Sequence, residues 1–335
     1  MPRTIRAVHQ VARPQGVPTA DHFAFVTAEL ADPTEGTALV ENLYLSVDPY
    51  MRQMMDGGEG RWGLNAPLEG RSVARVIESR TPELPVGTVL LHRQGWRTHA
   101  LVRPDEVRVL PDLPGVPLSA HLGVLGGTGL TAYVGLTRVA RLAPGEDVFI
   151  SAAAGGVGSA AGQIARLLGA RRVVGSVGSP AKAERVVESL GFDAAFDYHD
   201  GPVTELLRAA APEGIHVYLD NVGGEHLEAA IDALHPNGRI AWSGAIAQYN
   251  ATEAPAAPRN LADVMFKALR LEGFLVREHL DAQQELYALV APQIAAGRVV
   301  VEETVLHGFD RLVDAFLGVL TGANTGKMLV ALKPE

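Results

Sequence analysis

Cysteine is absent from the sequence, and this absence excludes disulfide bonds, thiol catalysis and thiolate metal sites. Histidine and carboxylate side chains remain as strong metal ligands. The 11 histidines are scattered, however, and form neither a His-x-His nor a His-Glu-x-x-His pair. We therefore expect no metal site, and we expect each histidine to be a surface or hydrogen-bonded structural residue.

Long apolar runs and basic runs are missing as well. No stretch approaches the roughly 18 uninterrupted apolar residues of a membrane span, and residues 1–16 lack the apolar core of a signal peptide. The balance of 29 Lys and Arg against 38 Asp and Glu gives a net charge of −9, which opposes nonspecific binding to nucleic acid or to an anionic membrane. The sequence predicts a cytoplasmic protein with neither of these as a partner.

Short β-branched runs separated by proline and glycine fill the first 120 residues. Residues 38–47, 72–78 and 86–91 are examples, and each is followed by turn-forming residues. They predict a β-rich domain, built as a partly open barrel. A chain of 335 residues is long enough for two domains, so a second one should follow.

Residues 146–170 read as a strand, a glycine turn and a helix in succession. An apolar strand at 148–150 leads into the dinucleotide fingerprint G-x-G-x-x-G, with Ala153 in place of its first glycine. Gly155 allows a close approach to a pyrophosphate, and Gly158 allows tight packing of the helix. We expect free amides from Gly156 to Ser159 to bind phosphate. The alternative is an Ala/Gly-rich helix start with no ligand.

The next strand, at 172–177, selects the cofactor. An enzyme that uses NAD usually carries an acidic residue at the end of this strand, where the ribose hydroxyls lie, and none is present here. Ser179 can donate a hydrogen bond to a 2′-phosphate, and Lys182 can supply the compensating charge. The sequence therefore favours NADP. Lys182 could instead be a solvated lysine in a first helical turn.

Strands and helices then alternate, which predicts parallel strands in a doubly wound α/β sheet. Strands are expected at 215–220 and 271–276, and the Ala- and Pro-rich residues 251–258 predict a loop. Turns follow Asp220 and Ser243, and they should meet the first glycine turn at the carboxyl edge of that sheet. Glycine-rich residues 122–136 lead into this domain, and the β-branched run at 299–305, which predicts a strand, leads out of it. We assign residues 126–299 to the nucleotide-binding domain, and residues 1–125 with 300–335 to the β-rich domain.

A polar and aromatic run directly follows the first of the β-rich strands named above. Tyr50, Met51 and Arg52 belong to it, and they are candidate substrate contacts because binding loops commonly follow strands. The alternative is a turn with a packed tyrosine.

Several motifs, in order along the chain, carry a family resemblance. They are D-P-Y-M-R at 48–52, G-L-T-A-Y at 129–133, A-A-A-G-G-V-G-S at 152–159, D-N-V-G-G at 220–224, S-G-A-I at 243–246, Gln248-Tyr249-Asn250, P-R-N-L at 258–261, E-G-F at 272–274, and Asn324 before Gly326-Lys327. The sequence resembles the zinc-independent medium-chain dehydrogenase/reductases, within the prostaglandin reductase and leukotriene hydroxydehydrogenase group. Residues 258–261 and 272–274 are similar to its bacterial branch, which includes curcumin reductase.

The resemblance implies a Rossmann domain, a GroES-like β-rich domain, a homodimer, and the NADPH-dependent reduction of the carbon-carbon double bond of an α,β-unsaturated ketone or aldehyde. Residues and resemblance together give the expected cofactor contacts: Gly155, Gly156, Val157, Gly158, Ser159, Ser179, Lys182, Tyr198, Asn221, Ser243, Gly244, Ala245, Ile246, Phe274, Leu275, Val276 and Asn324. Gln248 is expected to contact substrate. Thr128 departs from the family, which often has proline there.

Tyr249 is the expected catalytic residue. Hydride addition to the β-carbon leaves an enolate, whose oxygen needs a hydrogen-bond donor. The tyrosine hydroxyl or a cofactor ribose hydroxyl can fill this role. An NADPH quinone reductase and a non-catalytic NADPH-binding protein remain alternatives. A zinc alcohol dehydrogenase is disfavoured, because Glu69, Gly70 and Arg71 replace the expected Gly-His-Glu motif.

Overall fold

Two large sheets organise the chain, and the computed structural model describes residues 3–253 and 257–332. One sheet has six parallel strands in the order β10-β9-β8-β11-β12-β13. The strands are β8 (Asp147–Ile150), β9 (Arg172–Val177), β10 (Ala194–Asp197), β11 (Ile215–Asp220), β12 (Leu234–Trp242) and β13 (Arg270–Gly273). The chain starts in the middle of the sheet, extends to one edge, and returns to build the other half. This is the strand order of the Rossmann fold, and it confirms the predicted doubly wound sheet.

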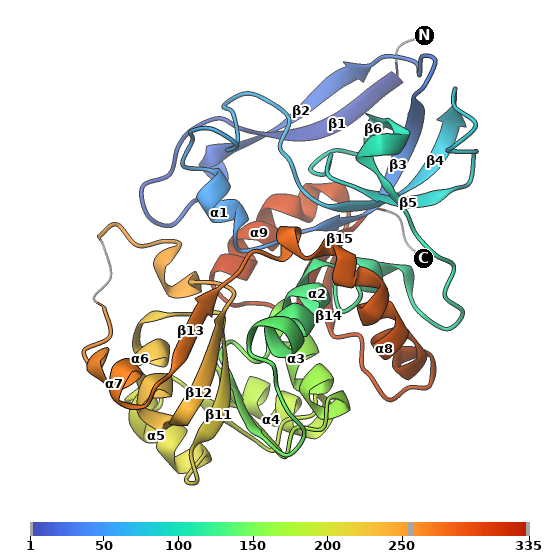
Figure 1. Ribbon diagram of the computed structural model, residues 1–335. Coiled ribbons are helices and arrows are strands. Elements are labelled where there is room, and N and C mark those ends of the chain that lie inside the picture. The colour runs from blue at the N-terminus through green and yellow to red at the C-terminus, as the bar shows by residue number, and fades with distance from the viewer. Residues whose placement is uncertain (1–2, 254–256, 333–335) are drawn as a thin grey trace.

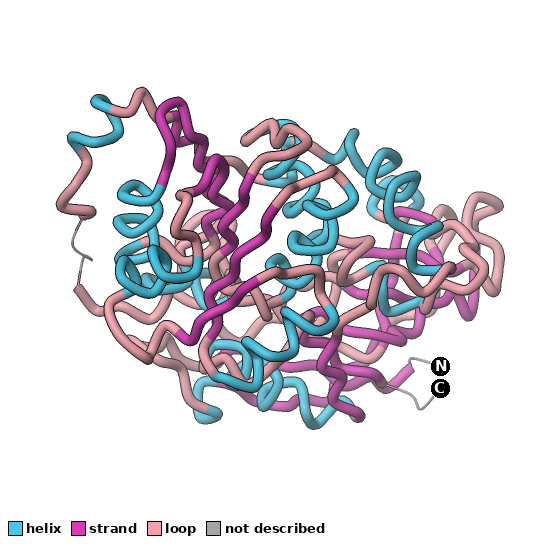
Figure 2. Tube along the Cα trace, turned by 90° about the horizontal axis from the view of Figure 1, so that it is seen from below, coloured by secondary structure: helices cyan, strands magenta, loops and turns pink. Residues whose placement is uncertain are grey.

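Helices cover both faces of this sheet, as the view in Figure 2 shows. They are α2 (Gly127–Val134), α3 (Gly156–Leu167), α4 (Pro180–Ser189), α5 (Val203–Ala210), α6 (Gly224–Ala233), α7 (Ala262–Phe266) and α8 (Gln283–Ala295). A π-helical turn at Gly135–Val139 extends α2.

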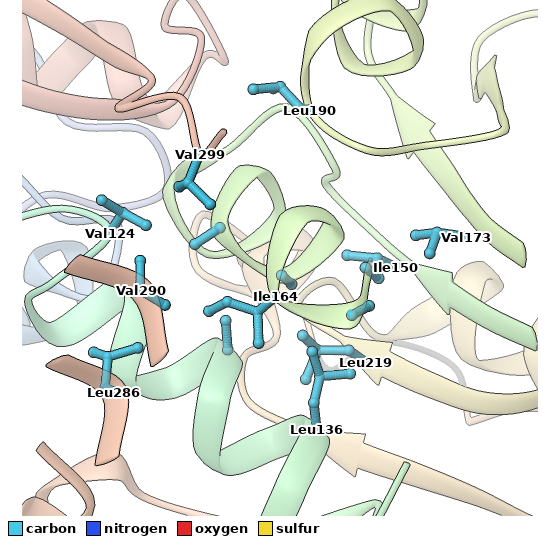
Figure 3. Close-up of a cluster of buried hydrophobic side chains, with 14 of the residues drawn as sticks. Val124, Leu136, Ile150, Ile164, Val173, Leu190, Leu219, Leu286, Val290 and Val299 are labelled. Carbon is cyan, nitrogen blue, oxygen red and sulfur yellow. The ribbon is translucent and has the colours of Figure 1, made fainter. Parts of the chain in front are cut away.

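Alternate residues of the central strand β8 point into two different cores. Val148 and Ile150 pack with side chains from α2, α3 and α8, whereas Phe149 packs with α5 and α6. The first core is drawn in Figure 3, where Ile164 of α3 lies among strand and helix side chains. Burial on both faces explains why this strand is apolar at successive positions.

The second large sheet has the order β14-β15-β3-β4-β5-β7, with β6 paired to β3; in Figure 1 it extends from β3, β4, β5 and β6 at the upper right to β15 and β14 near the centre. Its strands are β3 (Ala38–Ser46), β4 (Ser72–Ser79), β5 (Val89–His92), β6 (His99–Val102), β7 (Arg108–Val109), β14 (Glu303–His307) and β15 (Lys327–Ala331). A hairpin of β1 (Arg3–Gln10) and β2 (Phe23–Leu30), with helices α1 (Met51–Met54) and α9 (Leu312–Leu320), completes this part. β15 pairs with β3, so the chain returns to the N-terminal sheet as predicted.

Some predicted boundaries differ from the structure. The final strand pair begins at Glu303, because Val299 is buried in the core of the parallel sheet instead of extending a strand. β13 ends at Gly273, so Phe274 lies beyond the strand predicted for 271–276. The predicted loop at 251–258 falls partly outside the described residues. Among those that are described, no helix is both long and apolar enough to cross a membrane.

Candidate active site

The glycine turn joins β8 to α3 in a tightly packed conformation. Gly155 is the N-cap of α3. A Cβ atom placed on Gly158 would lie 2.3 Å from the Ala152 carbonyl oxygen and 2.6 Å from the Cα of Ala153, so only glycine fits there. Ala152 has a φ of 49°, in the left-handed region that L-residues seldom adopt. The turn therefore brings helix and strand into close contact, as the fingerprint predicts.

The amides at the start of α3 form the candidate phosphate site. Gly156, Val157 and Gly158 occupy the first three helical positions, whose N–H groups have no acceptor within the helix. Ser159 differs, because its amide donates to the Gly155 carbonyl at 2.9 Å and its side chain is buried. The prediction of a free amide at Ser159 is therefore wrong, and the row of free amides ends at Gly158.

Ser179 and Lys182 follow β9, where no acidic side chain stands. Ser179 is the N-cap of α4, and its hydroxyl oxygen accepts a hydrogen bond from the Lys182 amide at 3.3 Å. The Lys182 ammonium donates to the Gly322 carbonyl at 2.5 Å. Partial burial lowers the pKa of Lys182. Both side chains lie at the end of the strand where a 2′-phosphate is expected, although each also has a local structural partner.

Tyr198 lies beside these residues, just after β10. It is 41% exposed, and its ring lies 4.1 Å from that of His199 and 5.5 Å from that of His226. A Cβ atom on Gly178 would lie 3.4 Å from the Tyr198 hydroxyl. Tyr198 is thus a partly exposed aromatic side chain next to the turn after β9, where an adenosine contact is expected.

A polar network closes the carboxyl edge of the sheet between β8, β11 and β12. The Asn221 side chain donates to the Ser151 carbonyl at 2.7 Å and accepts from the Ser243 hydroxyl at 2.7 Å. Asp220 accepts from the amides of Val222 and Gly223, both at 2.8 Å. These bonds bring Asn221 and Ser243 together and hold their turns at the point where the strand order reverses.

Tyr249 and Gln248 rest on the turns that follow β12 and β11. The Tyr249 hydroxyl lies 3.5 Å from the position of a Cβ on Gly244, and the Gln248 amide nitrogen lies 3.6 Å from that of a Cβ on Gly223. Burial raises the pKa of Tyr249, against a smaller lowering by the backbone amide of Ala245. The hydroxyl is therefore protonated at neutral pH and able to donate a hydrogen bond.

The segment before β15 lies against the glycine turn. The Gly326 amide donates to the Ala154 carbonyl at 2.7 Å, and Gly155 and Gly326 form an isolated parallel bridge. The Asn324 side chain donates to the Gly326 carbonyl at 2.7 Å and is buried. The β-rich sheet thus reaches the glycine turn through this segment, and Asn324 stabilises the conformation of the segment.

Lys327 and Asp48 form a buried ion pair that the sequence did not reveal. Their nitrogen and carboxylate oxygen lie 3.2 Å apart, and both side chains are less than a tenth exposed. Lys327 also donates to the carbonyls of Val47 and Met328, while the Ser46 hydroxyl donates to Asp48 at 2.6 Å. Burial alone would raise the pKa of Asp48, but Lys327 and its other partners hold it below its usual value.

The predicted substrate loop divides into two parts. The Tyr50 hydroxyl is buried with no partner among the described residues, as a ligand-facing group can be. Met51 instead packs fully buried in a hydrophobic core. Arg52 is bound by the Gly16 carbonyl at 3.0 Å and by Asp56 at 2.5 Å. Met51 and Arg52 therefore have structural roles, and substrate contact by either stays a prediction.

The three predicted cofactor residues after β13 face in different directions. Phe274 packs inward, because a Cβ on Gly135 would lie 3.2 Å from its ring. Leu275 is 50% exposed. Gly244, Ala245, Ile246 and Val276 are half-buried along this same edge of the sheet. A role for these backbone segments beside the nicotinamide stays a prediction.

A zinc ion does not fit the position where the sequence departs from the zinc motif. Asp48 is already paired with Lys327, and Glu69 with Arg93 at 2.7 Å. The guanidinium of Arg71 adds a further positive charge beside them. Within 3–253 and 257–332, one group of side chains has ligand atoms close enough together to hold a metal ion. It consists of Asp147, His216 and His235, at the amino ends of the strands. Arg171 already binds both oxygens of that aspartate, at 2.8 and 2.5 Å.

Comparison with known proteins agrees with this geometry. A family described as N-terminal domain of oxidoreductase matches residues 6–110, and one described as Zinc-binding dehydrogenase matches residues 156–292. The chain is 41% identical over 321 residues to prostaglandin reductase 1 of Bos taurus, covering 94% of this chain and 95% of that protein. It is 39% identical over 317 residues to the NADP(+)-dependent 2-alkenal reductase of Nicotiana tabacum, covering 92% of each.

A solved structure has the same fold over the whole chain. The crystal structure of CurA in complex with NADPH from Vibrio vulnificus superposes with a TM-score of 0.92 at 34% identity, covering 98% of this chain and all of that one. The chain belongs to the medium-chain dehydrogenase/reductases. Within them it belongs to the group that contains the prostaglandin, 2-alkenal and curcumin reductases.

The buried ion pair generates a prediction about stability. Lys327→Met should lower the free energy of unfolding by about 3–5 kcal/mol, because it leaves the Asp48 carboxylate buried without its cation. The double variant Lys327→Met/Asp48→Asn should recover part of this loss. Equilibrium unfolding in urea measures both.

Arg103→Met is the matched control, since it breaks an ion pair with Asp105 in which the two side chains are 62% and 73% exposed. Its cost should stay within about 1 kcal/mol. Equal stability of Lys327→Met and the unmutated protein would contradict a structural role for the pair.

Proposed function

We propose that this protein uses NADPH to reduce the carbon-carbon double bond of α,β-unsaturated ketones and aldehydes. The observation that carries the proposal is the meeting of three turns at one sheet edge: the glycine turn after β8, and those after β11 and β12 that support Gln248 and Tyr249. In an open α/β sheet this edge is where a dinucleotide binds. The relatives named NADP-dependent 2-alkenal reductase and NADPH-dependent curcumin reductase support the same reaction class.

Separate groups of residues would bind the phosphate groups and the nicotinamide end of NADPH. The amides of Gly156, Val157 and Gly158 would bind the pyrophosphate, and Lys182 with Ser179 the 2′-phosphate. Tyr198 would pack by the adenosine, while Asn221, Ser243 and Asn324 would border the nicotinamide half. When bound, NADPH supplies a hydride for the β-carbon of the substrate.

Tyr249 would act on the substrate's carbonyl oxygen. Negative charge develops on that oxygen as the β-carbon is reduced, and a neutral hydroxyl donates a hydrogen bond to it most strongly in the transition state. The raised pKa of Tyr249 keeps its proton in place for this role. Solvent can then supply the proton that the α-carbon needs. Tyr50 and Gln248 would line the substrate side.

A substrate panel tests the proposal. NADPH oxidation is followed optically with enals, enones, quinones and saturated ketones. Turnover of enals and enones supports it, whereas turnover of quinones alone would identify an NADPH quinone reductase. No turnover of any class, with NADPH still bound, would identify a non-catalytic binding protein.

The division into a β-rich domain (1–125 with 300–335) and a nucleotide-binding domain (126–299) is part of the same proposal. It is supported by the two large sheets, because the six strands of the parallel sheet all fall within 126–299. The cytoplasmic location expected from the sequence stays a prediction.

A homodimer is the assembly we propose, through the sheet edge formed by β13. Among the described strands only β12 pairs with β13, so β13 is an edge strand to which a second chain could add. Large apolar side chains near this edge are exposed, among them Met265 at 70%, Phe266 at 75% and Leu280 at 64%. These residues belong to the segments before and after β13, and exposed large apolar side chains of this kind are typical of an interface.

The first prediction here concerns cofactor choice. Lys182→Ala should weaken NADPH binding by roughly ten-fold or more, because one charge-assisted phosphate contact is worth about 1.5–3 kcal/mol. NADH binding should not change. Arg185→Ala, which removes a charge from the same helix but at a pair with Glu302, is the control. Equal affinity of the unmutated protein for NADH and NADPH would contradict the assignment.

The second prediction concerns Tyr249. Tyr249→Phe should lower kcat with an enone more than it raises KM, by up to about 2.7–4 kcal/mol in transition-state stabilisation if no other donor compensates. NADPH affinity should be unchanged. Tyr133→Phe removes a hydroxyl bound to Glu285 and serves as control. If Tyr249→Phe reduced the enone at the rate of the unmutated protein, the cofactor ribose hydroxyl would remain as the hydrogen-bond donor to the enolate.

The third prediction concerns assembly. Light scattering at micromolar concentration should give twice the single-chain mass of 35.5 kDa. Phe266→Glu should shift the mass toward one chain, because a charge at the interface must lose its hydration. Val86→Glu alters a side chain that is 65% exposed and lies in the β-rich part, so it should leave the mass unchanged. A single-chain mass for the unmutated protein would refute the dimer.

A further inference from the structure

Arg71 is placed beside the substrate loop by the backbone. It directly precedes β4, and its carbonyl accepts a hydrogen bond from the Ser46 amide at 2.9 Å. The Ser46 position leads within two residues to Asp48 and the start of the loop that carries Tyr50. The pairing between the ends of β3 and β4 therefore fixes the position of the Arg71 backbone, from which the side chain extends.

The guanidinium of Arg71 lies between the substrate loop and α2. Its central carbon is 5.9 Å from the centre of the Tyr50 ring. A Cβ on Gly127 would lie 3.2 Å from the guanidinium, so glycine at the start of α2 leaves room for it. The next residue, Thr128, has its methyl group 3.2 Å from the Cβ position of Gly156 in the phosphate turn. Two neighbouring residues of α2 therefore contact the two sites: Gly127 lies against the Arg71 guanidinium, and Thr128 lies against the proposed cofactor site.

The carboxylates around Arg71 are bound by other cations. Asp48 is held by Lys327, and Glu69 by Arg93. Burial acts to lower the pKa of Arg71, but the nearby Tyr50, Asp48 and Glu69 together raise it above its usual value. Over the whole described chain, no hydrogen bond or ion pair reaches the Arg71 side chain, which is only partly exposed. Its N–H donors therefore remain available to a ligand, as does the buried, unpartnered hydroxyl of Tyr50.

We propose that Arg71 and the Tyr50 hydroxyl form an anion subsite that binds a carboxylate on the substrate, next to the double bond that is reduced. The inference rests on the proposed enone reductase activity. It names a substrate class within that activity: unsaturated ketones that carry a carboxylate at the far end of the double bond, as in 4-oxo-2-enoates. The double bond takes up a hydride and a proton, and the carboxylate itself is unchanged.

A carboxylate suits this subsite better than an enolate oxygen does. The guanidinium is planar, always charged, and presents a fork of donors that matches the two oxygens of a carboxylate. An enolate offers one oxygen, and Tyr249 is placed to serve it. A half-buried guanidinium without hydrogen-bonded partners is also poorly solvated, so a permanent anion stabilises it more than a transient charge can.

A matched pair of substrates tests the subsite. The acid 4-oxopent-2-enoate and its methyl ester are compared by their kcat/KM values in the presence of NADPH. Arg71→Gln should lower the acid-to-ester ratio by roughly ten-fold to a hundred-fold, because a charge-assisted contact is lost for the acid alone. Arg71→Lys should restore part of the ratio. Arg103→Gln removes a cation of the β-rich part whose ion pair with Asp105 is exposed, and it should leave the ratio unchanged.

Three outcomes would overturn the subsite. One is an unchanged acid-to-ester ratio in an Arg71→Gln variant that still folds and turns over the ester. Another is an equal fall in kcat for acid and ester, which would make Arg71 an enolate donor. The third is a selective loss of NADPH affinity, which would assign the guanidinium to the cofactor.

Failure of the proposed activity gives a different result, since the unmutated protein would then reduce neither substrate. In that case the subsite is measured without turnover. Calorimetry with NADP⁺ present should show 4-oxopentanoate binding more tightly than its methyl ester, and this difference should disappear in Arg71→Gln. Equal binding of the two compounds to the unmutated protein would refute the subsite.

Discussion

The hydrogen bond from the Gly326 amide to the Ala154 carbonyl joins the two large sheets where the proposed cofactor and substrate sites meet. It lies beside the Gly155–Gly326 bridge, so the last strand of the β-rich sheet begins next to the glycine turn between β8 and α3. The next residue, Lys327, extends from this contact to Asp48 and anchors the loop that carries Tyr50. The proposed cofactor and substrate groups are therefore positioned through one short segment.

The charges at this junction explain why the reaction of this family, which proceeds without zinc, is compatible with the residues of this chain. A zinc site would need anionic ligands, but the position where zinc would be expected holds the cations of Arg71 and Lys327. The carboxylates near these cations are already paired. The charge that forms on a substrate oxygen must therefore be stabilised by hydrogen bonds, for which Tyr249 offers a neutral hydroxyl. Arg71 retains unused donors, which makes it suitable for an anion that the substrate already carries.

Local sequence patterns were enough to predict the parallel sheet, because apolar strands, glycine turns and helices alternate with clear boundaries. β9 and β11 match the predicted residues at both ends. Contacts between distant segments could not be predicted in this way. Lys327 and Asp48 are 279 positions apart, and neither has a local pattern that marks it as one half of a pair. Substrate contact by Met51 was inferred from its loop and stays a prediction, but the packing of its side chain in a hydrophobic core could not be read from the sequence.

Direct transfer of hydrogen to the substrate tests the central claim most directly. The protein is incubated with an enone and with NADPH that carries deuterium at the reactive position of the nicotinamide, and the product is examined by mass spectrometry and NMR. The account predicts a saturated ketone with one deuterium, located at the β-carbon. An allylic alcohol labelled at the carbonyl carbon, or a product without deuterium, would contradict it.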